Sequence, residues 1–133
     1  MLLNNKQIMN KITEKLSEIF NEKQIQAMKD AWRYGQWGDC EILFNGENEN
    51  SWALGACTND IKVGKHFTGR QISGIISGIS KKIVETRTNL VKNIPDWWGD
   101  GTGDMIFFNY EAFGFENSTV AWDAFNEWSK SND

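Results

Sequence analysis

Apolar residues in the middle of the chain recur every three or four positions, which is the spacing of one face of a helix. The stretch runs from Thr68 to Asn93, and its apolar stripe comprises Ile72, Ile75, Ile76, Ile79, Ile83 and Leu90. Thr68 and Gln71 have the spacing of a capping box, in which each side chain accepts a hydrogen bond from the other residue's backbone. Pro95 lacks the amide hydrogen that a continuing helix needs. We therefore predict a core-facing helix over 68–93, with extended chain from Ile94.

Two glycines interrupt this predicted helix on a second, smooth face. Gly74 and Gly78 lie one turn apart, next to Ser73 and Ser77. A glycine inside a helix costs roughly 0.5–1 kcal/mol relative to alanine. The pair therefore predicts that another backbone approaches closely there.

The same helical spacing predicts three further helices. The first carries the stripe Ile8, Ile12, Leu16, Ile19 and Phe20, with Asn4 or Asn5 as its cap. The second begins at Asn21, forms a capping box with Gln24 and ends at Gly35; its inner face carries Ile25, Met28 and Trp32. The last is capped by Asn117 or Ser118, and its stripe comprises Ala121, Trp122, Phe125 and Trp128.

Shorter apolar runs predict the strands. The segments DCEILF and SWALGAC flank the polar turn NGENEN and indicate a β-hairpin. The run MIFFNYEAF follows the Gly-rich loop DWWGDGTGD and indicates a third, buried strand. The resulting order α-α-β-β-α-β-α predicts an α+β fold, in which a small antiparallel sheet packs with about four helices in a single domain over 1–133.

Composition narrows the function classes. A chain of 133 residues with 40% apolar residues suits one modest core. The net charge of −4 argues against a nucleic-acid binder driven by counterion release. No apolar run reaches membrane-spanning length, and the first residues lack a signal-peptide pattern. We therefore expect a cytoplasmic protein in which Cys40 and Cys57 are reduced.

A small basic group marks the start of the central helix. Lys65, His66 and Arg70 flank it, and together with the helix dipole they could hold an anion or a phosphate. The alternative is a solvated loop with ordinary charges. The segment is not a P-loop, because the Gly-Lys-Ser/Thr ending is absent.

Other candidate chemistry is sparse. Asp96, Asp100 and Asp104 could ligate a hard cation, but the EF-hand order of ligands is absent, and the alternative is a polar turn before a strand. His66 is the only histidine, and neither cysteine lies in a catalytic signature. We therefore predict no metal, no cofactor and no enzymatic activity.

Two groups of residues are candidates for binding a protein partner. Trp97 and Trp98 are adjacent, so both cannot face one core from a strand, and one of them could be an exposed anchor. Both could instead be tucked under the loop. Asp100 and Asp104 lie in that loop, while a second acidic group lies on the predicted hairpin and its tip. The second group comprises Glu41, Glu47 and Glu49, which form either a solvated turn or a ledge for a basic partner.

The start of the hairpin carries a family resemblance. Tyr34-Gly35-Gln36-Trp37, then Glu41-Ile42 and Asn45-Gly46, resembles the pattern of antirestriction proteins of the ArdB/KlcA type, with the turn one residue later and Trp52 on the return strand. The resemblance covers roughly 11–83 and stops before Pro95. The segments ISGIISG and AWDAFNEW are also similar to small phage proteins of Firmicutes. Both resemblances imply cargo of a mobile element. The resemblance to the ArdB type further implies a protein that blunts host restriction inside the cell without enzymatic motifs.

These observations lead to three hypotheses. The first is a phage- or plasmid-encoded inhibitor of restriction or CRISPR, which binds a host defence protein through the hairpin acids and the Trp97–Asp104 loop. The second is a binder or enzyme for a small ligand or nucleotide signal at Lys65, His66 and Arg70. The third is an immunity protein that neutralises a toxin. None involves direct contact with nucleic acid or a membrane, and a homodimer is compatible with all three.

Overall fold

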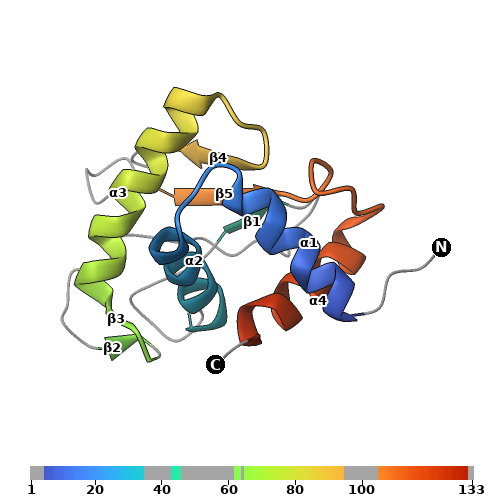
Figure 1. Cartoon of the computed structure of the whole chain (residues 1–133), viewed down its shortest axis with the longest axis horizontal. Coiled ribbons are helices and arrows are strands. Elements are labelled where there is room, and N and C mark those ends of the chain that lie inside the picture. Colours follow the sequence, from blue (N-terminus) through green and yellow to red (C-terminus); the bar gives the residue numbers. More distant parts are fainter. Residues whose placement is uncertain (1–4, 35–42, 46–61, 64, 95–104, 132–133) are drawn as a thin grey trace.

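Four helices and two small sheets make up the described part of the computed structural model, which covers residues 5–34, 43–45, 62–63, 65–94 and 105–131 (Figure 1). The helices are α1 (Asn5–Ser17), α2 (Glu22–Tyr34), α3 (Gly69–Thr86) and α4 (Ser118–Lys130). The strands are β1 (Leu43–Asn45), β2 (Lys62–Val63), β3 (Phe67–Thr68), β4 (Val91–Ile94) and β5 (Met105–Asn109). The predicted α+β class, with four helices and a small sheet, is confirmed.

The larger sheet has the order β1-β5-β4, with β5 in the middle. β5 pairs with β4 in antiparallel fashion and with β1 in parallel. The sequence indicated β5 but not its neighbour β4. The predicted return strand of the hairpin, SWALGAC, lies outside the described residues, as do Cys40 and Cys57.

The prediction that the central helix extends to Asn93 is wrong, because α3 ends at Thr86. Arg87 adopts the left-handed conformation, with φ 52° and ψ 36°, and its N–H donates to the carbonyl of Ile83 at 3.0 Å. A left-handed residue at this position closes the last helical turn and reverses the chain. Leu90 therefore belongs to the approach to β4 rather than to the helical stripe, although it is buried as predicted.

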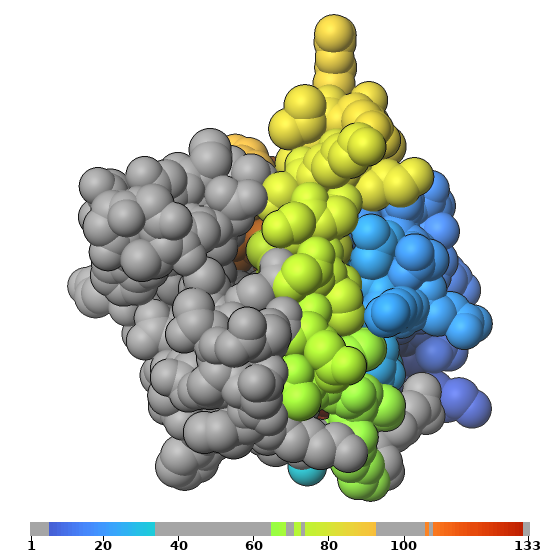
Figure 2. Space-filling model, turned by 90° about the vertical axis from the view of Figure 1, so that its left-hand side faces the viewer, coloured from blue at the N-terminus to red at the C-terminus, as the bar shows by residue number. Residues whose placement is uncertain are grey.

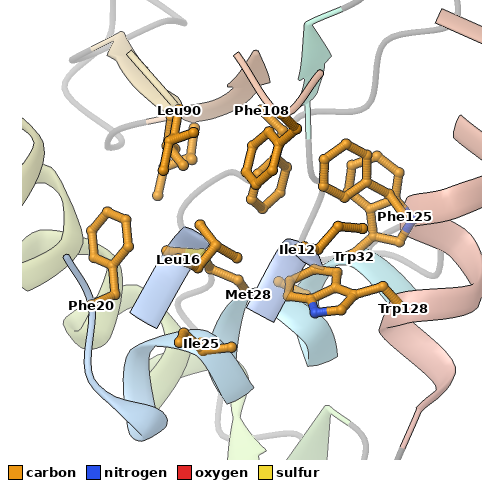
Figure 3. Packing of buried hydrophobic residues seen from close by; sticks show 14 of the residues in the cluster. Ile12, Leu16, Phe20, Ile25, Met28, Trp32, Leu90, Phe108, Phe125 and Trp128 are labelled. Carbon is orange, nitrogen blue, oxygen red and sulfur yellow. The ribbon is translucent and has the colours of Figure 1, made fainter. Parts of the chain in front are cut away.

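The core lies between the sheet and the helices. Figure 3 shows Leu90 and Phe108 pointing from the sheet towards Leu16 of α1 and Met28 of α2. Phe125 of α4 is the centre of an aromatic cluster. Its ring centroid lies 5.1–5.7 Å from the rings of Phe108, Trp32, Phe113 and Phe115.

Most of the predicted apolar stripes face this core. The predicted residues that are buried include Ile12, Leu16, Phe20, Ile25, Met28, Trp32, Ala121, Phe125 and Trp128. Trp122 is only partly buried, although it was placed on the core stripe, and its ring lies 5.4 Å from that of Trp32. Ile19 and Phe20 follow the end of α1 rather than lying within it.

Side-chain caps begin three of the helices. Asn21 and Gln24 exchange side-chain-to-backbone hydrogen bonds of 2.8 and 3.0 Å before α2. Thr68 and Gln71 form the reciprocal capping box predicted for α3, and Asn117 Oδ1 accepts from the N–H of Val120 at 2.9 Å. These caps satisfy backbone donors that a helix start would otherwise leave without partners.

Hydrogen bonds of two buried tryptophans tie α4 to the N-terminal helices. The indole N–H of Trp128 donates to Thr13 Oγ1 of α1 at 3.1 Å. The indole N–H of Trp32 in α2 donates to Asn126 Oδ1 of α4 at 2.8 Å. Each bond satisfies a polar atom that burial would otherwise leave unpaired.

Among the described residues, no backbone makes the close contact predicted at the α3 glycines. No described atom lies within 4 Å of the position that a Gly74 Cβ would take, and at Gly78 the nearest is the Gln24 side-chain amide nitrogen, at 3.5 Å. Gly74 lines a surface pocket, and for the segments outside the described residues the close contact stays a prediction.

Candidate functional site

A buried carboxylate on α2 holds the only histidine of the chain. Asp30 is 1% exposed, and its Oδ2 lies 3.0 Å from His66 Nδ1. The other carboxylate oxygen, Oδ1, accepts a 2.9 Å hydrogen bond from Gln26 Nε2. A buried carboxylate without such partners would be strongly unfavourable. The three side chains therefore form one hydrogen-bonded unit.

The local fold brings His66 to α2. Lys65 and His66 lie in the turn between β2 and β3, whose antiparallel pairing sets Val63 opposite Phe67. β3 leads directly into α3, because Thr68 is both its last residue and the N-cap of the helix. The capping box thus fixes the chain immediately after His66.

A pocket of about 420 Å³ lies between the start of α2, the turn before β3 and the first half of α3. Its lining residues come from α2, the turn, β3 and α3; they are Lys23, His66, Phe67, Gln71, Gly74 and Ile75. Figure 2 shows the face on which α3 (green to yellow) lies beside the N-terminal helices (blue). The volume is that of a small-molecule site, roughly 300–1,000 Å³, but the pocket is open to solvent, because Lys23, Gln71 and Gly74 are exposed.

The lining combines two kinds of group. Lys23 and His66 can carry positive charge, and the Gln71 side chain adds an amide. Gln71 Oε1 accepts from the N–H of Thr68 at 2.9 Å, so the amide NH₂ is the part of this side chain that remains to donate. Phe67 and Ile75 are partly buried and supply apolar surface. Gly74 adds room because it has no side chain.

The predicted anion group is only partly assembled here. His66 lines the pocket, whereas Lys65 is exposed and is not among the lining residues. Arg70 lies in the first turn of α3, and its side chain is outside the described part of the chain. The backbone N–H of Gln71 is already bound to Thr68 Oγ1, at 3.1 Å.

The predicted partner-binding residues cannot be placed. Glu41, Glu47, Glu49, Trp97, Trp98, Asp100 and Asp104 all lie outside the described residues, and so does Asp96. Within the part of the chain that is described, no group of three or more His, Cys, Asp or Glu side chains could hold a metal ion. None of the described helices has both the length and the apolar character needed to cross a membrane.

Sequence reasoning missed Asp30, Gln26 and Lys23. The pair Lys29-Asp30 has the character of a solvent-facing segment of an amphipathic helix. In the structure, however, α2 packs against α1, α3 and α4, so Ala27 to Trp32 are all buried. The 36 positions between Asp30 and His66 leave no local spacing that could have linked them.

The neighbouring Lys29 is also buried, but it contacts other residues. Its Nζ donates to Ser131 Oγ at 3.0 Å and lies 5.6 Å from the ring centroid of Trp128. Burial lowers the pKa of Lys29, and the charge of Asp30 partly opposes that shift. Lys29 thus packs against the end of α4 and is not part of the pocket lining.

Comparison with known protein families, curated proteins and solved structures finds no significant match to this chain.

Proposed function

We propose that this protein binds a small anionic ligand in the pocket between α2 and α3. The observation that carries the proposal is His66, which a buried carboxylate holds in a fixed orientation at a pocket of small-molecule size. A carboxylate that holds one ring nitrogen of a histidine fixes the orientation in which the other nitrogen faces a ligand.

The lining indicates the chemical class of the ligand. The Lys23 ammonium would attract a carboxylate or phosphate group, and His66 lies on the same lining. Phe67 and Ile75 offer a surface for an apolar or aromatic part of the same molecule. This distribution favours an amphiphilic metabolite of modest size over a bare inorganic ion.

The inhibitor hypothesis rests on other residues and stays a prediction. Its acidic and tryptophan groups lie outside the described residues, so binding to a host restriction or CRISPR component, like binding to a toxin, has no support from the geometry. Expression of the protein in bacteria that carry single defence systems, followed by phage plating, would test it directly.

Ligand binding can be tested by NMR. A ¹⁵N-labelled sample would be titrated with adenosine monophosphate and, separately, with hydrogen phthalate. We expect shifts at Lys23, Gln71 and Ile75 with saturation, together with loss of these shifts in Gly74→Leu, whose side chain would enter the pocket. Gly78→Ala is the matched control, because it also changes an α3 glycine but lies outside the lining. Shifts that map elsewhere, or that persist in Gly74→Leu, would contradict the proposal.

A further inference from the structure

The two ring nitrogens of His66 have different environments. Carboxylate oxygens only accept hydrogen bonds, so Asp30 requires that His66 Nδ1 carry a hydrogen. The imidazole therefore accepts and releases its second proton at Nε2. Among the described residues none forms a hydrogen bond with Nε2, and the His66 side chain is 37% exposed where it lines the pocket. A bound molecule or a water can reach this nitrogen.

A histidine oriented in this way is suited to acid–base catalysis. A carboxylate on one nitrogen fixes the tautomer and stabilises the imidazolium that forms when the other nitrogen takes a proton. We propose that His66 is a catalytic general base and acid, that Asp30 is its positioning residue, and that the pocket hydrolyses a carboxylic ester of an anionic ligand. The inference rests on the ligand site proposed above, and it departs from the sequence-based prediction that the chain is not an enzyme.

The reaction balances with water as the only co-reactant. His66 Nε2 takes a proton from water as the water oxygen bonds to the ester carbonyl carbon, which gives a tetrahedral intermediate. The bond from that carbon to the alcohol oxygen then breaks, and the imidazolium returns its proton to the departing oxygen. The products are a carboxylic acid and an alcohol.

The pocket lining can stabilise the charge that develops. The carbonyl oxygen becomes negative in the intermediate and needs hydrogen-bond donors or a cation nearby. The Gln71 amide NH₂ and the Lys23 ammonium are on the same pocket lining as His66. One amide and one ammonium suit the single oxyanion of an ester carbonyl. Among the described residues, Asp30 contacts the imidazole, Lys23 lies on the same pocket lining, and Lys65 precedes His66 in the turn.

The tautomer can be measured without knowing the substrate. Because the chain has one histidine, a two-bond ¹H–¹⁵N correlation spectrum contains a single set of imidazole signals. We expect the neutral ring to be protonated at Nδ1. In Asp30→Asn, the amide oxygen should accept from Gln26 Nε2, as Oδ1 does now, which turns the NH₂ towards His66 Nδ1. The neutral ring should then switch to protonation at Nε2. A wild-type ring protonated at Nε2 would overturn the inference.

Catalysis is tested with the mono-4-nitrophenyl ester of succinic acid, which combines a carboxylate with an activated ester. We expect the wild-type protein to release 4-nitrophenolate faster than the ester does in buffer alone. The rate should fall at least about 100-fold in His66→Gln, the lower end for loss of a general base. Asp30→Asn should lower the rate, because a ring that carries its hydrogen on Nε2 cannot take a proton there. Gly78→Ala should hydrolyse the ester at the wild-type rate.

The proposed ligand binding and the proposed catalysis can be refuted separately. The amide analogue, N-(4-nitrophenyl)succinamate, keeps the charge and the ring but resists hydrolysis. Shifts of Lys23, Gln71 and Ile75 with this analogue, combined with ester hydrolysis no faster in wild type than in His66→Gln, would overturn catalysis and leave the ligand site standing. Absence of those shifts with the analogue and with both earlier ligands would overturn the ligand site and the inference with it.

Discussion

The most direct test of the pocket is a substitution at Gly74. This residue lies in the interior of α3, is exposed, and has no described atom within 4 Å of where a Cβ would be built. An added methyl group meets no clash, while alanine removes the entropic cost of a helical glycine. We therefore expect Gly74→Ala to raise the free energy of unfolding by about 0.5–1 kcal/mol.

The gain is large enough to measure. For a chain of 133 residues, 1 kcal/mol corresponds to a change in Tm of about 3–5 °C, so Gly74→Ala should raise Tm by about 2–5 °C. Urea unfolding followed by tryptophan fluorescence, with an unchanged m-value, would give the free energy itself. Gly78→Ala is the matched control, since its new Cβ meets the Gln24 side chain at 3.5 Å, an ordinary contact, and should give a similar gain.

The two glycines should differ in ligand binding rather than in stability. Gly74→Leu keeps good helix propensity but places a branched side chain where the pocket is. It should therefore be at least as stable as the wild type and should weaken ligand binding more than 10-fold. A Gly74→Ala variant that is less stable than the wild type by 1 kcal/mol or more would refute the reasoning, because another part of the chain would then occupy the space beside α3.

Three further predictions concern the core. Phe125→Ala should lower the free energy of unfolding by about 3–5 kcal/mol, because Phe125 is fully buried at the centre of the aromatic cluster; a loss below about 1 kcal/mol in urea would contradict this. Thr13→Val should cost about 1–3 kcal/mol, because it removes the acceptor of the buried Trp128 indole N–H; Thr13→Ser, which keeps the hydroxyl, should cost less in the same assay. Burial lowers the pKa of Lys29 below its ordinary value of 10.5. Between the folded-state and unfolded-state pKa values the unfolded chain therefore binds more protons than the folded chain. The free energy of unfolding should rise as pH increases towards 10.5. Lys29→Met should remove this rise, and equal pH slopes for the two proteins between pH 8 and 10.5 would exclude the assigned cause.

Local signals in the sequence were sufficient for most helix starts. The capping pairs at Asn21 and Thr68, and the cap at Asn117, depend on residues within three positions of one another, and each is present in the structure. The end of α3 was misjudged because Arg87 has no intrinsic preference for the left-handed conformation that ends the helix. The residues that follow Leu90 pair with β5 as strand β4, and this pairing keeps Leu90 out of the helix despite its helical spacing.

The site depended on tertiary contacts that no local pattern records. His66 was recognised as a candidate from its type and its position before a helix. Its partner Asp30 was not, because the burial of α2 on several sides follows from the packing of three other helices around it. The sequence therefore indicates the basic neighbours of His66 but not the carboxylate that positions its imidazole.

The contact between α1 and α4 constrains how the chain can fold during its synthesis. Thr13 and Trp128 are 115 positions apart, so Trp128 must leave the ribosome before α1 can find its partner. At about 5–20 residues per second, that interval lasts roughly 6–23 s. Throughout it, the apolar stripe of α1, including Ile12 and Leu16, can pack against α2 but lacks α4. The nascent chain would be a natural client for ribosome-associated chaperones, and premature termination before α4 would yield a product that cannot complete its core.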